Sequence, residues 1–119
     1  MPSGHELDDH ILIDLTTTPM MSTTVERGSR IAVLLKNIPN YSWRLPNYSN
    51  SIIELEHVRA CCLVDNASMV PDNTKQLYYF TVFGFGQTKI QFRARQNSED
   101  PSVAEAPNDI VITLNLLVN

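Results

Sequence analysis

Alternation of apolar and polar residues constrains the fold of this chain more than any other feature. It is clearest in QTKIQFRAR, residues 87–95, where one parity holds Thr88, Ile90, Phe92 and Ala94 and the other holds Gln87, Lys89, Gln91, Arg93 and Arg95. Side chains of an extended chain point alternately to two faces. The segment therefore predicts a strand with one buried face and one face in water.

The same alternation recurs along the chain and predicts further strands at residues 10–15, 29–36, 41–45, 76–83 and 109–118. In the short strand 41–45, Tyr41, Trp43 and Leu45 share a parity, which predicts that all three face the core. Gly-Phe-Gly at 84–86 separates two alternating runs, so it predicts a tight hairpin in which 76–83 pairs antiparallel with 87–95.

The segment SIIELEHVRACCLV, residues 51–64, changes parity in its middle. Ile53 and Leu55 keep one parity, whereas Val58, Ala60 and Cys62 keep the other. A β-bulge near His57, or two short strands, would reconcile them. A helix is the alternative, although the segment has β-branched ends and lacks an N-cap.

About seven strands with turn residues between them are typical of an all-β, antiparallel β-sandwich. Two irregular segments remain, at about residues 65–75 and 96–108. The second, rich in acidic residues and proline, is predicted to be a solvated loop, and its length suggests a role in recognition.

Length and charge narrow the classes of function. The 119 residues suit one domain, and the net charge of −4 argues against nucleic acid as a partner. The N-terminal sequence has no basic region typical of a signal peptide, and no window approaches the roughly 18 apolar residues of a membrane span. We expect a cytoplasmic protein without membrane insertion, in which the adjacent Cys61 and Cys62 are reduced, partly buried thiols.

No segment carries a signature of catalysis, and we predict that the chain is not an enzyme. His57 and Cys61 lie about 13 Å apart on an extended chain, too far for a Cys-His pair. His5, Asp8, Asp9 and His10 lie in a terminal segment that we expect to be mobile. We predict no metal site and no cofactor.

A doubled tetrapeptide, Pro-Asn-Tyr-Ser at residues 39–42 and 46–49, is interpreted as two turns at the ends of the short strand 41–45. Aromatic residues at or beside predicted turns leave protein binding as the favoured class of function. A carbohydrate-binding sandwich that uses exposed Tyr48 and Phe85 is a weaker alternative.

The sequences of several strands resemble those of a known protein family. The run YYFTVFGFGQTKIQFRAR, followed by a loop and DIVITLNLLV, resembles the last three strands of chagasin-type inhibitors of papain-like cysteine peptidases, and NYSW resembles their GYSW. The likeness spans roughly residues 25–119. It implies an immunoglobulin-like β-sandwich over 25–119, preceded by an N-terminal segment, 1–24, that forms a first strand or a flexible arm.

The resemblance also implies three loops that block a peptidase cleft. Their positions in this chain are, in the first loop, Lys36, Asn37, Ile38, Pro39 and Asn40, followed by Tyr41; in the second, Pro71, Asp72, Asn73 and Thr74; and in the third, Arg95, Gln96, Asn97 and Ser98. The family motifs there are NPTTG, GxGG and Arg-Pro-Trp, and this chain departs from all three. Asn40 retains the tolerance of glycine for positive φ.

Two functions follow from the resemblance. The first is inhibition of papain-family cysteine peptidases by occlusion of the active-site cleft. The second is a non-inhibitory role for the same sandwich, as an adaptor or structural subunit of a larger protein assembly. Shared strands alone do not separate them, because function depends on the loop residues.

Overall fold

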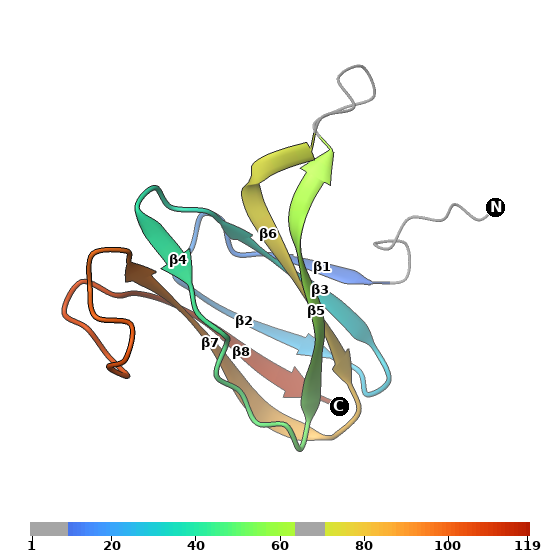
Figure 1. Cartoon of the computed structure of the whole chain (residues 1–119). Coiled ribbons are helices and arrows are strands. Elements are labelled where there is room, and N and C mark those ends of the chain that lie inside the picture. The colour runs from blue at the N-terminus through green and yellow to red at the C-terminus, as the bar shows by residue number, and fades with distance from the viewer. Residues whose placement is uncertain (1–9, 64–70) are drawn as a thin grey trace.

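Two four-stranded sheets make up the protein (Figure 1). The computed structural model describes residues 10–63 and 71–119, without the side chains of 61–63 and 71–73. Sheet A has the order β1-β3-β6-β5, built from β1 (Ile11–Asp14), β3 (Arg30–Lys36), β6 (Pro71–Val82) and β5 (Ile53–Leu63). Sheet B has the order β2-β8-β7-β4, built from β2 (Met20–Val25), β8 (Ile110–Val118), β7 (Gly86–Gln96) and β4 (Tyr41–Trp43).

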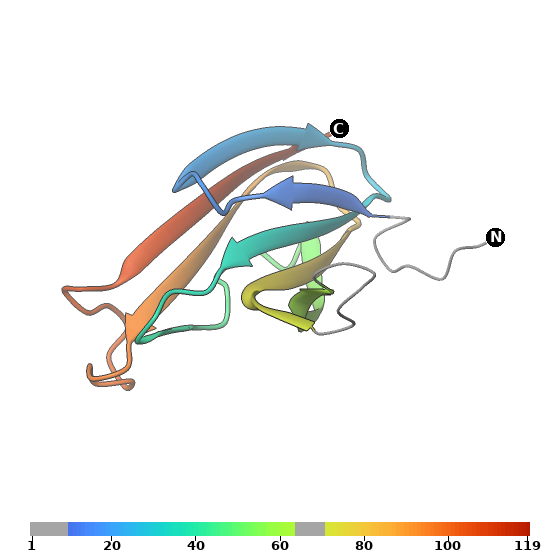
Figure 2. The ribbon, with the colours of Figure 1, turned by 90° about the horizontal axis from the view of Figure 1, so that it is seen from above.

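The core lies between the two sheets, which form separate layers in Figure 2. Both contribute the alternate residues of their strands, and Ile31, Phe80, Ile90, Phe92 and Leu114 are fully buried. Edge-to-face contacts join Phe92 to Tyr78 and Phe80, at centroid distances of 5.1 and 6.4 Å. The predicted buried face of 87–95 is thereby confirmed.

The predicted all-β sandwich is confirmed, with eight strands among the described residues where about seven were expected. Two pairings are parallel, β1 with β3 and β2 with β8, whereas the other four are antiparallel. Residues 11–14 and 20–25 thus add an edge strand to each sheet, and a domain boundary at residue 25 stays a prediction. In the part of the chain that the structure describes, no helix is long and apolar enough to cross a membrane.

The predicted hairpin at Gly84–Gly86 is wrong. β6 pairs with β3 and β5 in sheet A, whereas β7 pairs with β8 and β4 in sheet B, so the connection crosses between the sheets. The amides of Phe83 and Gly84 both donate to the carbonyl of Ile52, at 2.9 and 3.0 Å. These bonds hold the turn against the segment before β5 and direct the chain into the other layer.

The segment 53–63 is one strand with an irregularity, so the helical alternative is wrong. The register of β5 on β6 shifts between Leu55 and His57, where a bulge was predicted. β5 is an edge strand, and part of its edge is covered because the Leu55 amide donates to the hydroxyl of Tyr48 at 3.1 Å. Edges of this kind invite association with other strands when they are left open.

The prediction that Leu45 faces the core is wrong, because β4 ends at Trp43 and Leu45 is 84% exposed. Beyond β4 the chain follows the edge of β7, where Asn47 exchanges backbone hydrogen bonds with Gln91. The buried residue of this stretch is Pro46. Trp43 itself is half-buried and packs against the core.

Candidate protein-binding site

The β3–β4 loop, residues 37–40, and the β7–β8 loop, residues 97–109, lie side by side at one end of the sandwich (Figures 1 and 2). The amide of Asn97 donates to the carbonyl of Asn40 at 2.8 Å. The hydroxyl of Ser42 donates to Oδ1 of Asn97 at 2.7 Å. Because β4 pairs with the end of β7, Tyr41 opposite Gln96, both loops start from a shared ladder.

Asn40 gives the β3–β4 loop its sharp turn. Its φ of 70° is the only positive value at a non-glycine residue in the described chain, and the Tyr41 amide closes the turn on the Ile38 carbonyl at 3.0 Å. Asparagine adopts this conformation more readily than most side chains, as its place in the sequence predicted. Pro39 and Asn40 are exposed at the tip, and Ile38 is half-buried.

The base of the β3–β4 loop is tied to its neighbours. The indole Nε1 of Trp43 donates to the carbonyl of Lys36 at 3.2 Å. The amide of Asn37 donates to the carbonyl of Thr74 at 2.7 Å. The loop is therefore anchored on β4 at one side and on β6 at the other.

A buried ion pair closes the β7–β8 loop. Arg95, at the end of β7, donates from Nε and Nη2 to the two carboxylate oxygens of Asp109, both at 2.7 Å, and only 5% and 2% of the two side chains are exposed. Arg93 adds a third bond to Oδ2 of Asp109 at 3.0 Å. Fork-to-fork pairs of this geometry are among the strongest hydrogen-bonded contacts in proteins.

The same guanidinium also holds the loop from inside. Its Nη1 donates to the carbonyls of Asp100 and Val103, at 3.0 and 2.7 Å, and Nη2 donates to that of Ala104 at 3.1 Å. The prediction that Arg95 lies on the wet face of its strand is wrong, because residues 100–104 wrap around it. Arg95 thus organises the loop internally instead of pointing from it toward a partner.

Hydrogen bonds within the loop set the charge states of its acids. Arg95 holds the pKa of Asp109 well below its usual value, and hydrogen bonding to Asp109 raises the pKa of Arg95. The amide and hydroxyl of Ser102 lower the pKa of Asp100, and both donate to its Oδ1. Asn108 donates to Gln96 and to Glu99, at 3.3 and 3.0 Å. The predicted solvated loop is therefore exposed along much of its length but highly ordered.

The second predicted loop takes another form. Pro71, Asp72, Asn73 and Thr74 lie in β6, where Pro71 pairs with Leu63 of β5, rather than in a loop. Residues 64–70 lie outside the described residues. Of the second set, Thr74 is joined to the β3–β4 loop, since its carbonyl accepts the Asn37 amide.

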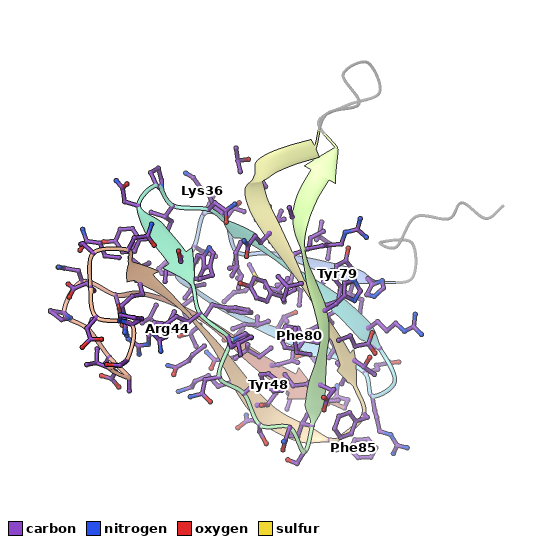
Figure 3. All side chains as sticks on the ribbon, in the orientation of Figure 1. Lys36, Arg44, Tyr48, Tyr79, Phe80 and Phe85 are labelled. Atoms are coloured by element: carbon purple, nitrogen blue, oxygen red, sulfur yellow. The ribbon has the colours of Figure 1, made fainter. Side chains whose placement is uncertain are left out.

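Three residues that the sequence did not single out complete the site. Ser42 joins the loops, Asp109 closes the β7–β8 loop, and Arg44 donates from Nη1 to the carbonyl of Pro101 at 3.0 Å. Figure 3 shows Arg44 beside that loop. Only the opposite charges of Arg95 and Asp109 at the two ends of a long loop offered a signal in the sequence.

Of the residues considered for catalysis or metal binding, the structure describes the side chains of His10 and His57, and both pack against one aromatic ring. His57 stacks on Tyr79, with ring centroids 4.3 Å apart, and His10 contacts the same ring at 5.0 Å. His5, Asp8, Asp9 and the side chains of Cys61 and Cys62 lie outside the described residues. Among residues 10–63 and 71–119, no three histidine, cysteine or acidic side chains lie close enough to hold a metal ion.

A hollow of about 510 Å³ lies on the outer face of sheet B, away from the loops. Its polar side chains come from facing positions of β2, β8 and β7, and include Ser22, Asn115 and Lys89. No hydrogen bond joins Ser22 to Lys89 in the described structure, so the hollow shows no activated nucleophile. The loop end therefore remains the best candidate site.

Tyr48 and Phe85, the pair considered for carbohydrate binding, differ in exposure. Tyr48 is half-buried, contacts Phe80 edge to face at 5.5 Å and accepts the Leu55 amide (Figure 3). Phe85 is 61% exposed. Only one of the two aromatic rings is therefore well placed to stack on a sugar.

Solved structures share this fold, although no protein-family model and no curated protein sequence matches the chain. The cysteine protease inhibitor EhICP2 from Entamoeba histolytica superposes with a TM-score of 0.64, at 14% identity over 92% of this chain and 94% of that one. Amebosin has a TM-score of 0.50 at 18% identity, covering 92% and 98%. PbICP-C, solved in complex with falcipain-2, has a TM-score of 0.47 at 10% identity over 92% and 98%.

The match to EhICP2 covers nearly the whole of both chains, and the resemblance that the strands suggested is confirmed at the level of the fold. This chain therefore shares the β-sandwich fold of the cysteine protease inhibitor EhICP2 and of amebosin.

Proposed function

We propose that this protein inhibits papain-like cysteine peptidases by placing its β3–β4 and β7–β8 loops across the active-site cleft. The fold shared with EhICP2 supports the class of partner. The observation that carries the proposal is the direct bonding of the two loops, Asn97 to Asn40 and Ser42 to Asn97, at one end of a rigid sandwich.

Inhibition would proceed by occlusion, without covalent chemistry. The tip of the β3–β4 loop presents Pro39, Asn40 and the half-buried Ile38, none of which is a nucleophile. A proline and an aliphatic side chain suit an apolar cleft. Because bonds within and between the loops hold them in place, little conformational entropy would be lost on binding, and preorganisation of this kind favours affinity.

The remaining predicted positions take different parts in this proposal. Asn37, Tyr41, Gln96 and Asn97 lie in or beside the joined loops and would border the contact. Arg95 would act through the shape of the β7–β8 loop. Pro71, Asp72, Asn73 and Thr74 would contribute from the adjoining end of sheet A.

Competition kinetics with papain and a panel of related peptidases test the proposal directly. Wild-type protein should inhibit reversibly and in competition with a fluorogenic substrate. Pro39→Glu, which adds a charge at the exposed tip, should weaken inhibition by about 30-fold or more, as expected for a central contact. Asn50→Glu adds the same charge at an exposed site far from the tip and should leave inhibition unchanged.

Calorimetry separates occlusion from reaction with the enzyme. A papain variant whose nucleophilic cysteine is replaced by alanine should still bind. The proposal fails if wild-type protein inhibits no member of the panel at micromolar concentration, or if Pro39→Glu and Asn50→Glu weaken inhibition equally.

A second candidate, an adaptor or structural subunit that does not inhibit, is favoured by the loop chemistry. Ile38 and Pro39 stand where the family carries threonines, and the guanidinium of Arg95 is engaged within its own loop. Native mass spectrometry of the protein purified from its source would show a stable complex in that case. A lone monomer that binds a peptidase at nanomolar concentration would exclude it.

A further inference from the structure

The turn between β6 and β7 presents two phenylalanines to solvent at the end of the molecule opposite the loops. Phe83 is 45% exposed and Phe85 is 61% exposed. β7 has 11 residues and therefore spans roughly 35 Å between this turn and the β7–β8 loop. Figure 3 places Phe85 at the far end of the sandwich from the labelled Arg44.

The turn is held rigidly in place. Two amides, those of Phe83 and Gly84, share the carbonyl of Ile52 as acceptor. A Cβ atom at Gly84 would lie 2.6 Å from the carbonyl oxygen of Ser51 and 2.9 Å from the Cα of Ile52. The close approach requires glycine, so the two rings are displayed on a backbone that is fixed against the segment before β5.

A cation accompanies the rings. The guanidinium carbon of Arg27, from the turn between β2 and β3, lies 4.8 Å from the centroid of the Phe85 ring. Arg27 forms no ion pair with a residue of the described chain. The protein as a whole is acidic, with a net charge of −4, so a cation without an ion pair beside exposed aromatic rings differs from the general surface.

Aromatic residues and arginine are the side chains most enriched at the centres of protein interfaces. An apolar side chain can pack on the two rings, and a carboxylate can pair with Arg27. A chain segment that carries both groups in sequence is complementary to this surface in polarity and charge.

We infer that Phe83, Phe85 and Arg27 form a second protein-binding site, which takes an acidic peptide segment containing bulky aliphatic residues. The site is independent of the proposed inhibition, since it lies at the other end of the sandwich. A partner bound here leaves both loops accessible, so one molecule can hold two proteins at once.

Synthetic ten-residue peptides with two central leucines test the site on the full-length protein. One set has aspartates flanking the leucines, a second has lysines in their place, and a third has aspartates flanking serines. Binding is followed by amide chemical shifts of the ¹⁵N-labelled protein. The chain has only four glycines, so Gly84 and Gly86 are well-dispersed reporters at the site itself.

The aspartate–leucine set should bind and the other two sets should not. Phe85→Ser should weaken binding by about tenfold or more, whereas Leu45→Ser, which removes a still more exposed apolar side chain elsewhere, should have no effect. The Arg27→Glu variant should no longer bind the aspartate–leucine peptides and should bind the lysine–leucine peptides, since specificity at this site depends on charge.

Several outcomes overturn the inference. These are failure of the wild-type protein to bind the aspartate–leucine set, equal binding by Phe85→Ser, and unchanged charge preference in Arg27→Glu. Binding to phosphatidylserine vesicles without binding to any peptide would likewise exclude a protein partner in favour of a lipid surface. None of these results bears on peptidase inhibition, which Phe85→Ser should retain in full.

Discussion

Arg95 and Asp109 face each other across the two ends of the β7–β8 loop, joined by two hydrogen bonds of 2.7 Å from Nε and Nη2 to the carboxylate. The loop between them passes over the guanidinium, which donates hydrogen bonds to three of its carbonyl groups. A single side chain therefore closes the loop and supports its interior. This arrangement turns a long, polar segment into a defined surface beside the β3–β4 loop.

Replacement of Arg95 by lysine should loosen the β7–β8 loop. Lysine keeps the charge but cannot donate in the planar fork that meets Asp109 and the loop carbonyls together. Backbone amides of residues 97–108 should exchange with deuterium about tenfold faster or more, and inhibition of a peptidase should weaken in parallel. Arg93→Lys, which alters a single bond to Asp109, is the control and should change exchange less. Unchanged exchange in Arg95→Lys would show that the loop orders itself without the ion pair.

The ion pair should also shape stability in acid. Because the pKa of Asp109 in the folded protein lies well below its usual value of about 4, the unfolded chain binds more protons in the interval between the two values. The free energy of unfolding should therefore be steady near neutral pH and decrease as the pH falls below about 4. Asp109→Asn should be less stable at pH 7 and lose part of this slope. Asp14 and Asp100, whose pKa values are also lowered, should preserve the remainder. Urea unfolding at pH 7, 4 and 3 measures both effects, and equal slopes in the two proteins would contradict this account.

The two copies of Pro-Asn-Tyr-Ser should respond differently to the same change at asparagine. Asn40 has a φ of 70°, so Asn40→Ala should destabilise the protein by about 1 kcal/mol, while Asn40→Gly should be tolerated. Asn47→Ala is the matched control, because Asn47 has no such backbone conformation and bonds through its main chain. Chemical unfolding of the three variants checks the order. Equal effects at positions 40 and 47 would count against a role for backbone strain.

The tyrosines of the two copies offer a second matched pair. The hydroxyl of Tyr48 accepts the amide of Leu55 at the edge of β5, so Tyr48→Phe leaves a partly buried donor without this acceptor. The loss should be about 0.5–1.5 kcal/mol. Tyr41→Phe removes a hydroxyl that bonds to no described residue and should be close to neutral. Thermal unfolding monitored by circular dichroism compares the two. A neutral Tyr48→Phe would mean that water replaces the hydroxyl without loss.

Gly84 should resist replacement for reasons of space. In Gly84→Ala the new Cβ meets the backbone of Ser51 and Ile52, which cannot yield as a flexible side chain would, and the expected destabilisation is about 1–3 kcal/mol. Gly28 has open space around it but a φ of +93°, so Gly28→Asn is the comparison: it strains the backbone without a steric clash and should destabilise the protein less than Gly84→Ala. Urea unfolding of both variants tests this, and a fully stable Gly84→Ala would show that the turn can move away from β5.

Local features of the fold were predictable from the sequence alone. Alternation located the strands except β2 and the start of β6, it identified the buried face of 87–95, and the change of parity near His57 located the irregularity in β5. These predictions succeed because the alternation of side chains between two faces is a property of the local backbone, and only one of the two faces can contact an apolar core. The left-handed turn at Asn40 could be predicted from the sequence for the same reason, since it depends on the conformational freedom of one residue.

Other features depend on which strands pair with each other, and the alternation of apolar and polar residues does not indicate the pairing. It marks the apolar face of a strand but not the sheet that the strand joins, so the connection at Gly84–Gly86 was mistaken for a hairpin, and the parallel pairings of β1 and β2 were missed. The position of Arg95 in the alternating pattern predicted that its side chain faces water. Only the folded loop supplies the carboxylate and carbonyl groups that bury it. The sequence by itself determined a β-sandwich and the places where its chain turns, because those follow from local periodicity and backbone freedom. The tertiary structure alone decided which loops meet and which charges pair, because those contacts join residues that are distant in the sequence and that only the pairing of strands brings together.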